Sequence, residues 1–236
     1  MQKNKLVFLI RAYNESSRIV GVIESIFARG FGEILVVDDG STDGTSELLA
    51  RAFDQPIHFV RHIVNRGAGA ALETGFEYVR RNATKNGWDF LVTFDADGQH
   101  DIADIGLFFE AFEKDASLDI VFGSRFIVKT ESNVPPLRRM ILWGGRIFTR
   151  MISNINLTDS HNGYRMFRVG VLDTISLSMD GMEYASELID QIHLGGFRYK
   201  EVPVNIHYDA YTLGKGQRFG GPFRIVARMI YKKFFS

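Results

Sequence analysis

Short apolar runs alternate with helical patterns through the first hundred positions of the chain. Four runs are mostly apolar and have the length of strands: residues 6–10, 33–37, 57–60 and 89–94. Between them, apolar side chains recur at helical spacing over three segments: residues 19–27, 43–53 and 68–81. Continuous apolar strands separated by amphipathic helices are typical of a parallel sheet covered on both faces. The pattern therefore predicts an α/β fold with a mostly parallel central sheet.

The pattern becomes less regular from about residue 135. It predicts a long helix over about 136–155, a helix over about 182–194 and a strand over about 198–206. A Gly-rich stretch and a last short helix follow. Since no linker, repeat or low-complexity segment interrupts the chain, we expect residues 1–236 to form a single domain.

Composition narrows the functional classes. Lys plus Arg and Asp plus Glu both number 28, so no basic excess points to a nucleic acid partner, and we expect none. The chain has no cysteine, which excludes disulfides and zinc–thiolate sites and fits the reducing cytoplasm. No apolar run approaches the ~20 residues that a membrane-spanning helix needs. We therefore expect a cytoplasmic protein, soluble or peripheral at the membrane.

Polar clusters follow four of the predicted strands. They are residues 11–15, 38–41, 65–69 and 95–100. A single cluster of this kind is often a turn or a helix cap. In parallel α/β sheets, however, ligands bind beyond the carboxyl ends of the strands, where all four clusters would meet. We expect a binding site at this edge.

Asp95 and Asp97 form the strongest pair in these clusters. Residues two apart in an extended backbone project to the same side, so both carboxylates can face one cation. Their hard oxygens suit Mg²⁺ or Mn²⁺, and Gln99 could add a neutral oxygen. A calcium-binding EF-hand loop is excluded, because Gly98 comes too early and Gly106 stands where that loop needs Glu.

Two further clusters have structural alternatives. Asp38 and Asp39 end a predicted strand, where an Asp can accept from a base N–H or a ribose hydroxyl, and we assign the capping of the next helix to Asp43 or Ser41 instead. Residues 67 and 69 are glycines without the spacing of a dinucleotide loop or the lysine of a Walker loop. Tight helix packing explains them better than phosphate binding.

Five motifs occur in an order that resembles a known family. They are Ala12-Tyr13-Asn14-Glu15, residues 36–45 (VVDDGSTDGT), residues 65–71 (NRGAGAA), residues 95–100 (DADGQH) and Gly123-Ser124-Arg125. Together they resemble a family 2 glycosyltransferase of the GT-A fold, and are most similar to the polyprenyl-phosphate (dolichol-phosphate) mannosyl- and glucosyltransferases. The resemblance implies an inverting, metal-dependent transfer of a hexose from a UDP-, GDP- or dTDP-sugar to a lipid phosphate.

The resemblance also implies roles for particular residues. Catalytic residues would be Asp95, Asp97, Arg125, Glu183 and Glu187. Metal ligands would be Asp95, Asp97 and Gln99. Contacts to the nucleotide-sugar would come from Arg11, Tyr13, Glu15, Val37, Asp39, Ala96, Lys215 and Arg218. The chain departs from the family pattern at two places. Arg11 stands where the family usually has proline. Residues 208–218 differ from the family's usual basic loop, so either Lys215 or Arg218 would contact the phosphate.

Several alternatives stay open. We expect residues 1–125 to hold the donor and residues 126–218 to face the acceptor. A phosphate acceptor needs no strong base, whereas a hydroxyl in polysaccharide assembly would need one from Glu183, Glu187 or Asp159. A nucleotidyltransferase is a second enzymatic alternative, but it would carry a Gly-rich basic loop near its N-terminus, which this chain lacks. A non-catalytic subunit that binds sugar nucleotides is a third alternative, and the intact Asp95/Asp97 pair argues against it.

Two segments indicate a membrane surface. Residues 136–155 and 219–236 each place arginines or lysines beside an apolar stripe, as basic amphipathic helices at anionic membranes do. A stripe of this kind also packs against a protein's own core, which suits the first segment better. A small membrane-protein partner and an oligomer remain open alternatives.

Overall fold

The structure is a computed structural model, and it describes residues 2–53, 57–127 and 155–209 together with positions 134, 139, 144 and 146. Most of the helix predicted over 136–155 and all of the terminal segment 219–236 lie outside these residues. Lys215 and Arg218 lie outside them as well.

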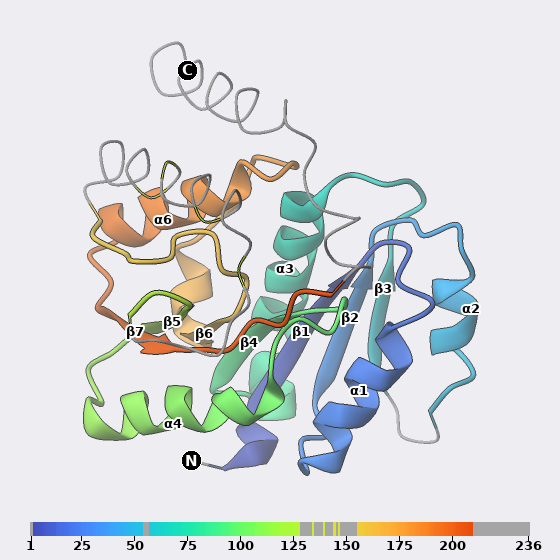
Figure 1. Cartoon of the computed structure of the whole chain (residues 1–236), viewed down its shortest axis with the longest axis horizontal. Coiled ribbons are helices and arrows are strands. Elements are labelled where there is room, and N and C mark those ends of the chain that lie inside the picture. Colours follow the sequence, from blue (N-terminus) through green and yellow to red (C-terminus); the bar gives the residue numbers. More distant parts are fainter. Residues whose placement is uncertain are drawn as a thin grey trace.

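A seven-stranded sheet forms the centre of the described chain, in the order β3-β2-β1-β4-β6-β5-β7 (Figure 1). The strands are β1 (Leu6–Ala12), β2 (Ile34–Asp38), β3 (His58–Arg61), β4 (Phe90–Asp95), β5 (Ile120–Ser124), β6 (Arg165–Arg168) and β7 (Tyr199–Pro203). Only β6 runs antiparallel to its neighbours. The prediction of a mostly parallel sheet is confirmed.

Helices cover both faces of the sheet, as predicted. Helix α1 (Ile19–Ala28) and helix α4 (Ile105–Lys114) contribute to one buried apolar cluster, with Phe8 and Phe94 of the sheet. Helix α3 (Ala68–Asn86) and helix α6 (Tyr184–Leu194) contribute to the other, with Leu9 and Leu91. Successive side chains of a buried strand point to opposite faces, which is why β1, β2 and β4 each supply both clusters.

The helix predicted over residues 43–53 is shorter in the structure, where α2 spans Thr45–Leu49. The residue at its N-cap position is Gly44, with φ +90, rather than Asp43. Helix α4 and strands β5 and β6 were not predicted. Short 3₁₀ turns, η1 (Lys3–Lys5), η2 (Ile102–Asp104) and η3 (Val169–Asp173), complete the described elements.

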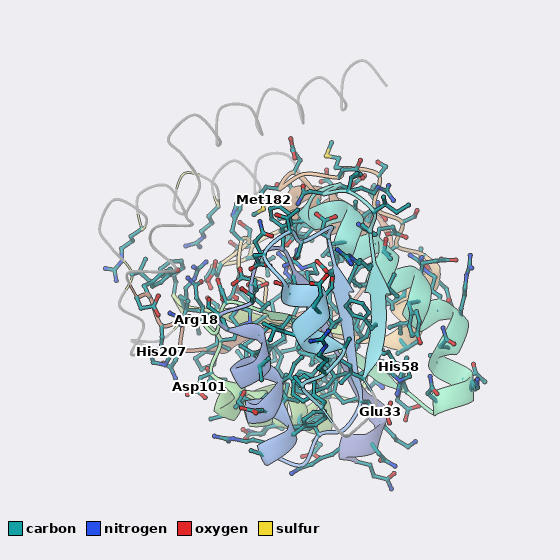
Figure 2. The ribbon with its side chains drawn as sticks, turned by 90° about the vertical axis from the view of Figure 1, so that its right-hand side faces the viewer. Arg18, Glu33, His58, Asp101, Met182 and His207 are labelled. Atoms are coloured by element: carbon teal, nitrogen blue, oxygen red, sulfur yellow. The ribbon has the colours of Figure 1, made fainter. Side chains whose placement is uncertain are left out.

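Strand register brings the polar clusters to one edge. Arg11 pairs with Asp95 of β4, and the next residue, Ala12, pairs with Asp38 of β2. In the side view of Figure 2, Met182 lies near the end of the molecule where these strands finish, and Glu33 lies near the end where β2 begins. No helix of the described residues is long and apolar enough to cross a bilayer.

Candidate active site

The loop after β1 is joined by hydrogen bonds to the loop after β2. Asn14 adopts a left-handed conformation with φ +55. Its backbone N–H donates to Ser41 Oγ at 2.9 Å, and its side-chain oxygen accepts from the Thr42 N–H at 2.9 Å. This junction leaves the Tyr13 ring 45% exposed at the rim, while Glu15 beside it is buried. Tyr13 is thus open to a ligand, and Glu15 is largely enclosed.

Asp43 reinforces the same junction. Its carboxylate accepts from the Ser16 N–H at 3.0 Å and from the Thr45 N–H at 3.1 Å. Burial alone would raise the pKa of Asp43, but the hydrogen bond from the Thr45 hydroxyl at 2.5 Å, together with those from Ser16 and the Thr45 N–H, lowers it to about 2. Asp43 therefore satisfies a backbone donor of the first turn of α2, as predicted for a cap, although it stands one residue before the N-cap position.

Asp39 holds the loop that follows β3. Its carboxylate accepts from the Arg66 N–H at 2.9 Å and the Gly67 N–H at 2.8 Å, and lies 2.7 Å from His62 Nδ1. The side chain is 5% exposed. The predicted contact with a base or ribose stays a prediction, and the structure gives Asp39 a role that the sequence did not suggest.

The last two residues of β2, Val37 and Asp38, are enclosed. The side chain of Val37 is fully buried in the core beside α3, so only its backbone faces the edge. Asp38 is also fully buried, and its carboxylate accepts from the Ser41 N–H at 2.9 Å and from the Ser46 hydroxyl. Asp38 thus joins the turn over residues 38–41 to helix α2.

Gly67 and Gly69 pack tightly against residues 179–181. The Gly69 N–H donates to the Asp180 carbonyl at 2.7 Å. A Cβ on Gly67 would collide with that carbonyl, and one on Gly69 with the carbonyl of Met179. The interpretation of these glycines as packing residues is confirmed.

The end of β4 and the loop after it carry the three predicted metal ligands, Asp95, Asp97 and Gln99, whose role stays a prediction. Gly98 has φ +75, which lets the chain turn so that the Gln99 N–H donates to Asp97 Oδ1 at 3.0 Å. Asp95 and Asp97 are both partly exposed, whereas Ala96 and Gln99 are buried. The two carboxylates are thus the solvent-facing groups of this loop.

Asp95 lies among cationic and polar neighbours. Its Oδ1 accepts from Arg11 Nη2 at 2.9 Å, and its Oδ2 lies 3.3 Å from His100 Nε2. Burial alone would raise the pKa of Asp95, but His100 and Arg11 lower it, so the carboxylate is ionised at neutral pH. Burial lowers the pKa of His100. The ring of His100 also stacks on Tyr164, with centroids 4.9 Å apart.

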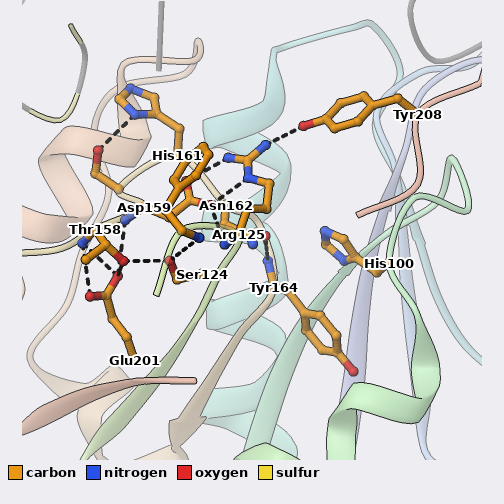
Figure 3. A network of polar contacts seen from close by, with 12 residues as sticks. His100, Ser124, Arg125, Thr158, Asp159, His161, Asn162, Tyr164, Glu201 and Tyr208 are labelled. Atoms are coloured by element: carbon orange, nitrogen blue, oxygen red, sulfur yellow. Dashed lines mark hydrogen bonds and ion pairs between the residues drawn. The ribbon is translucent and has the colours of Figure 1, made fainter. Parts of the chain in front are cut away.

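Arg125 and Asp159 form a buried ion pair at the same edge (Figure 3). Arg125 donates from Nε to Asp159 Oδ2 at 2.6 Å and from Nη2 to Oδ1 at 2.7 Å, a two-pronged geometry. Arg125 also donates from Nη1 to Tyr208. Burial alone would lower the pKa of Arg125, but Asp159 and Tyr208 raise it. The predicted diphosphate contact of Arg125 stays a prediction, and Asp159 is engaged here rather than placed as a base.

The turn over residues 159–165 encloses a second arginine that the sequence reasoning did not single out. Arg165 is 2% exposed, and its guanidinium donates to the Asn162 carbonyl at 2.9 Å and the Ser160 carbonyl at 3.1 Å. The side-chain nitrogen of Asn162 is buried and has no hydrogen-bond partner among the residues that the structure describes. The signal for Arg165 was its place at the end of a polar turn, six residues after Asp159.

The two predicted acidic residues of α6 differ. Glu187 accepts from the Ser178 N–H at 3.1 Å, the Ser178 hydroxyl at 2.6 Å and the Met179 N–H at 2.9 Å. It anchors the segment that covers Gly67 and Gly69, and its predicted catalytic role stays a prediction. Glu183 is 5% exposed and lies against Gly181, at the start of the helix. Its predicted role remains a prediction.

Arg11 does not lie at the rim with Tyr13. Besides Asp95, it donates to the Tyr184 hydroxyl at 2.8 Å, and its guanidinium lies 5.1 Å from the centre of the Tyr184 ring. Within the described residues, no group of three His, Cys, Asp or Glu is arranged to hold a metal ion. Asp95 and Asp97 therefore supply two carboxylates, and further ligands would come from elsewhere.

Comparison with known proteins identifies a family and named relatives that this chain resembles. The glycosyl transferase family 2 model matches residues 8–176. A UDP-N-acetylglucosamine–dolichyl-phosphate N-acetylglucosaminyltransferase of Methanococcus voltae is 29% identical over 98% of this chain and 97% of its own length. An undecaprenyl-phosphate mannosyltransferase of Micrococcus luteus is 32% identical over 80% of this chain and 76% of its own.

A solved structure shares the fold. Glucosyl-3-phosphoglycerate synthase of Mycobacterium tuberculosis, in complex with Mn²⁺, UDP and its product, superposes with a TM-score of 0.70 at 16% identity, over 97% of this chain and 79% of its own. That likeness supports the predicted GT-A architecture. With a family model that matches residues 8–176 and a sheet edge built from its motifs, the chain belongs to glycosyl transferase family 2 and is a glycosyltransferase.

Proposed function

We propose that the chain transfers a hexose from a nucleotide-sugar to a polyprenyl phosphate, with inversion at the anomeric carbon and with Mg²⁺ or Mn²⁺ held by Asp95 and Asp97. One observation carries the proposal: the ionised carboxylate of Asp95 ends the central strand β4 and is partly open to solvent, with Asp97 on the same loop. Relatives named as lipid-phosphate sugar transferases, which match most of this chain, support the acceptor class.

The residues present fit a divalent cation. Two hard carboxylate oxygens are few for a complete protein site, but Mg²⁺ commonly takes one or two carboxylates and completes its shell with phosphate oxygens and water. When bound, the cation would neutralise charge that develops on the leaving diphosphate. Asp97 would keep its orientation through the Gln99 N–H at 3.0 Å, and Asp95 through Arg11.

The remaining residues suit binding and orientation. Tyr13, exposed at the rim, would contact the nucleotide of the donor, and the Asn14–Ser41 hydrogen bond fixes its loop. Arg125, held by Asp159, would supply positive charge to a phosphate group. Because a phosphate acceptor is already ionised at neutral pH, it can attack the anomeric carbon without a base, and Glu183 would then only line the site.

A screen of donors and acceptors tests the proposal. The whole chain is incubated with Mn²⁺, each of several UDP-, GDP- and dTDP-hexoses, and either a polyprenyl phosphate or an oligosaccharide with free hydroxyls. We expect one donor class to yield a polyprenyl-phosphate sugar whose anomeric configuration, read by NMR, is opposite to that of the donor. Transfer only to the oligosaccharide would favour the hydroxyl-acceptor alternative, and a retained configuration would contradict inversion.

A further inference from the structure

Strand register fixes a permanent cation beside a predicted metal ligand. Arg11 and Asp95 are Cα partners in the adjacent parallel strands β1 and β4, so their side chains emerge on the same face. Their side chains are only 14% and 29% exposed, and Arg11 Nη2 donates to Asp95 Oδ1 at 2.9 Å.

Arg11 has two further anchors that do not involve Asp95. Its Nη1 donates to the Tyr184 hydroxyl at 2.8 Å and approaches the Ala68 carbonyl at 3.4 Å. Tyr184 begins α6, and Ala68 begins α3. The guanidinium is therefore held in place from the other side and stays near Asp95 even when that carboxylate changes its partner.

The charge of Arg11 is permanent, because an arginine guanidinium stays protonated at every physiological pH. Its Nη2 donates directly to the Asp95 carboxylate, which places that charge at hydrogen-bond distance from the predicted metal ligand.

We propose that Arg11 is a resident counter-cation of the metal site, which holds the Asp95 carboxylate in place and lowers the intrinsic affinity of the site for a divalent cation. This inference rests on the proposed function, because it takes Asp95 as a metal ligand. A divalent cation near Asp95 meets a carboxylate whose charge is already compensated, and it is repelled by the guanidinium beside it. Donor diphosphate, being negative, would be attracted by both cations. The site would therefore favour the metal together with the nucleotide over the metal alone.

The test measures Mn²⁺ binding to the chain without nucleotide, by the loss of the electron paramagnetic resonance signal of free Mn²⁺. Arg11→Gln removes the charge and keeps a polar side chain, and Arg11→Lys keeps the charge. We expect Arg11→Gln to bind Mn²⁺ about tenfold more tightly than the wild type, since a nearby repulsive charge is gone. Arg11→Lys should stay within about twofold.

Two controls isolate the effect. Arg81 lies on α3 in an exposed ion pair with Glu77, so Arg81→Gln removes the same charge far from Asp95 and should leave Mn²⁺ affinity unchanged. Adding Asp95→Asn to Arg11→Gln should abolish the gain. Equal or weaker Mn²⁺ binding by Arg11→Gln would overturn the inference while leaving the metal site intact. If no variant binds Mn²⁺ and the wild type binds none even with UDP, the proposed metal site fails, and the inference fails with it.

A measurement on the wild type covers the case in which Arg11→Gln does not fold. The Nε–H signal of Arg11 is assigned by its loss in Arg11→Lys. Mg²⁺ should shift this signal in the wild type and leave it unchanged in Asp95→Asn. A signal that does not respond to Mg²⁺, although Mg²⁺ binds in an Asp95-dependent way, would contradict the inference.

Discussion

Gly163 lies directly against Asp95: a Cβ built on Gly163 would come within 2.7 Å of Asp95 Oδ2. The Gly163 carbonyl in turn accepts from the Thr93 hydroxyl at 2.5 Å, which fixes its position beside β4. Because Gly163 has no side chain, the Asp95 carboxylate fits beside it. The turn over residues 159–165 therefore packs directly against the end of β4.

Gly163→Ala should therefore impair activity more than stability. The added methyl group must displace the Asp95 carboxylate, and we expect kcat to fall at least about tenfold, which corresponds to ~1.4 kcal/mol in the activation barrier. Gly170→Ala is a matched control, because a Cβ there meets nothing within 4 Å. Steady-state kinetics and thermal melting of both variants check this. A Gly163→Ala enzyme with full kcat would show that Asp95 needs no such space.

Asp39→Ala should lower stability, whatever its effect on nucleotide binding. The substitution removes the acceptor of the Arg66 and Gly67 N–H groups, whose hydrogen bonds are part-buried, and of the buried His62 ring. Unsatisfied buried donors cost ~1–3 kcal/mol, and we expect a loss of that size in the free energy of unfolding. Urea denaturation measures it, with the exposed Glu24→Ala as control. Unchanged stability in Asp39→Ala would mean that the loop does not depend on this carboxylate.

Asp43 should contribute stability that depends on pH. Its pKa of about 2 in the folded chain lies below the ordinary value of 3.8. A depressed carboxyl pKa stabilises the folded state above the unfolded pKa, and this stabilisation is lost as the pH falls from 3.8 toward 2. The melting temperature of Asp43→Asn should thus lie below that of the wild type at pH 6, and the gap should close near pH 2. A gap that stays constant over this range would contradict the account.

The basic, apolar terminal sequence predicts attachment to a membrane. We expect the whole chain to sediment with anionic liposomes at low salt and to be released at high salt, as basic amphipathic segments are. Truncation after Gly221 should abolish sedimentation and leave binding of nucleoside diphosphate intact. If the whole chain stays in the supernatant at low salt, a soluble acceptor becomes the better hypothesis.

Periodicity predicted the elements of the first half, because buried parallel strands and their covering helices carry strong local patterns. The apolar runs predicted β1, β2 and β4, and helical spacing predicted α3. Strand β6 has no apolar run, because two of its four residues are arginines. One of these, Arg165, is buried, and backbone carbonyls accept hydrogen bonds from its guanidinium. β5 did carry an apolar run, Ile120–Phe122, which was not recognised.

The site was predicted by position rather than by contact. Strand ends placed Asp39 and Asp95 at one edge, and register confirms that edge. The partners of these carboxylates come from distant segments. Asp39 holds residues 62–67, and Arg11, which donates to Asp95, also donates to Tyr184, 173 positions after Arg11 in the chain. Local sequence does not encode such pairings, which is why the protein contacts of Arg11 and Glu187 were not predicted.

The central claim is that Asp95 and Asp97 hold a divalent cation that transfer to a polyprenyl phosphate requires. The most direct measurement is the initial rate of sugar transfer to a polyprenyl phosphate as Mn²⁺ is titrated, for wild type and for Asp97→Asn. We predict no transfer in excess EDTA, saturable restoration by Mn²⁺ in the wild type, and a rate at least about a hundredfold lower in a folded Asp97→Asn at every Mn²⁺ concentration. Wild-type transfer that persists in excess EDTA, or an Asp97→Asn enzyme with the wild-type response to Mn²⁺, would contradict the claim.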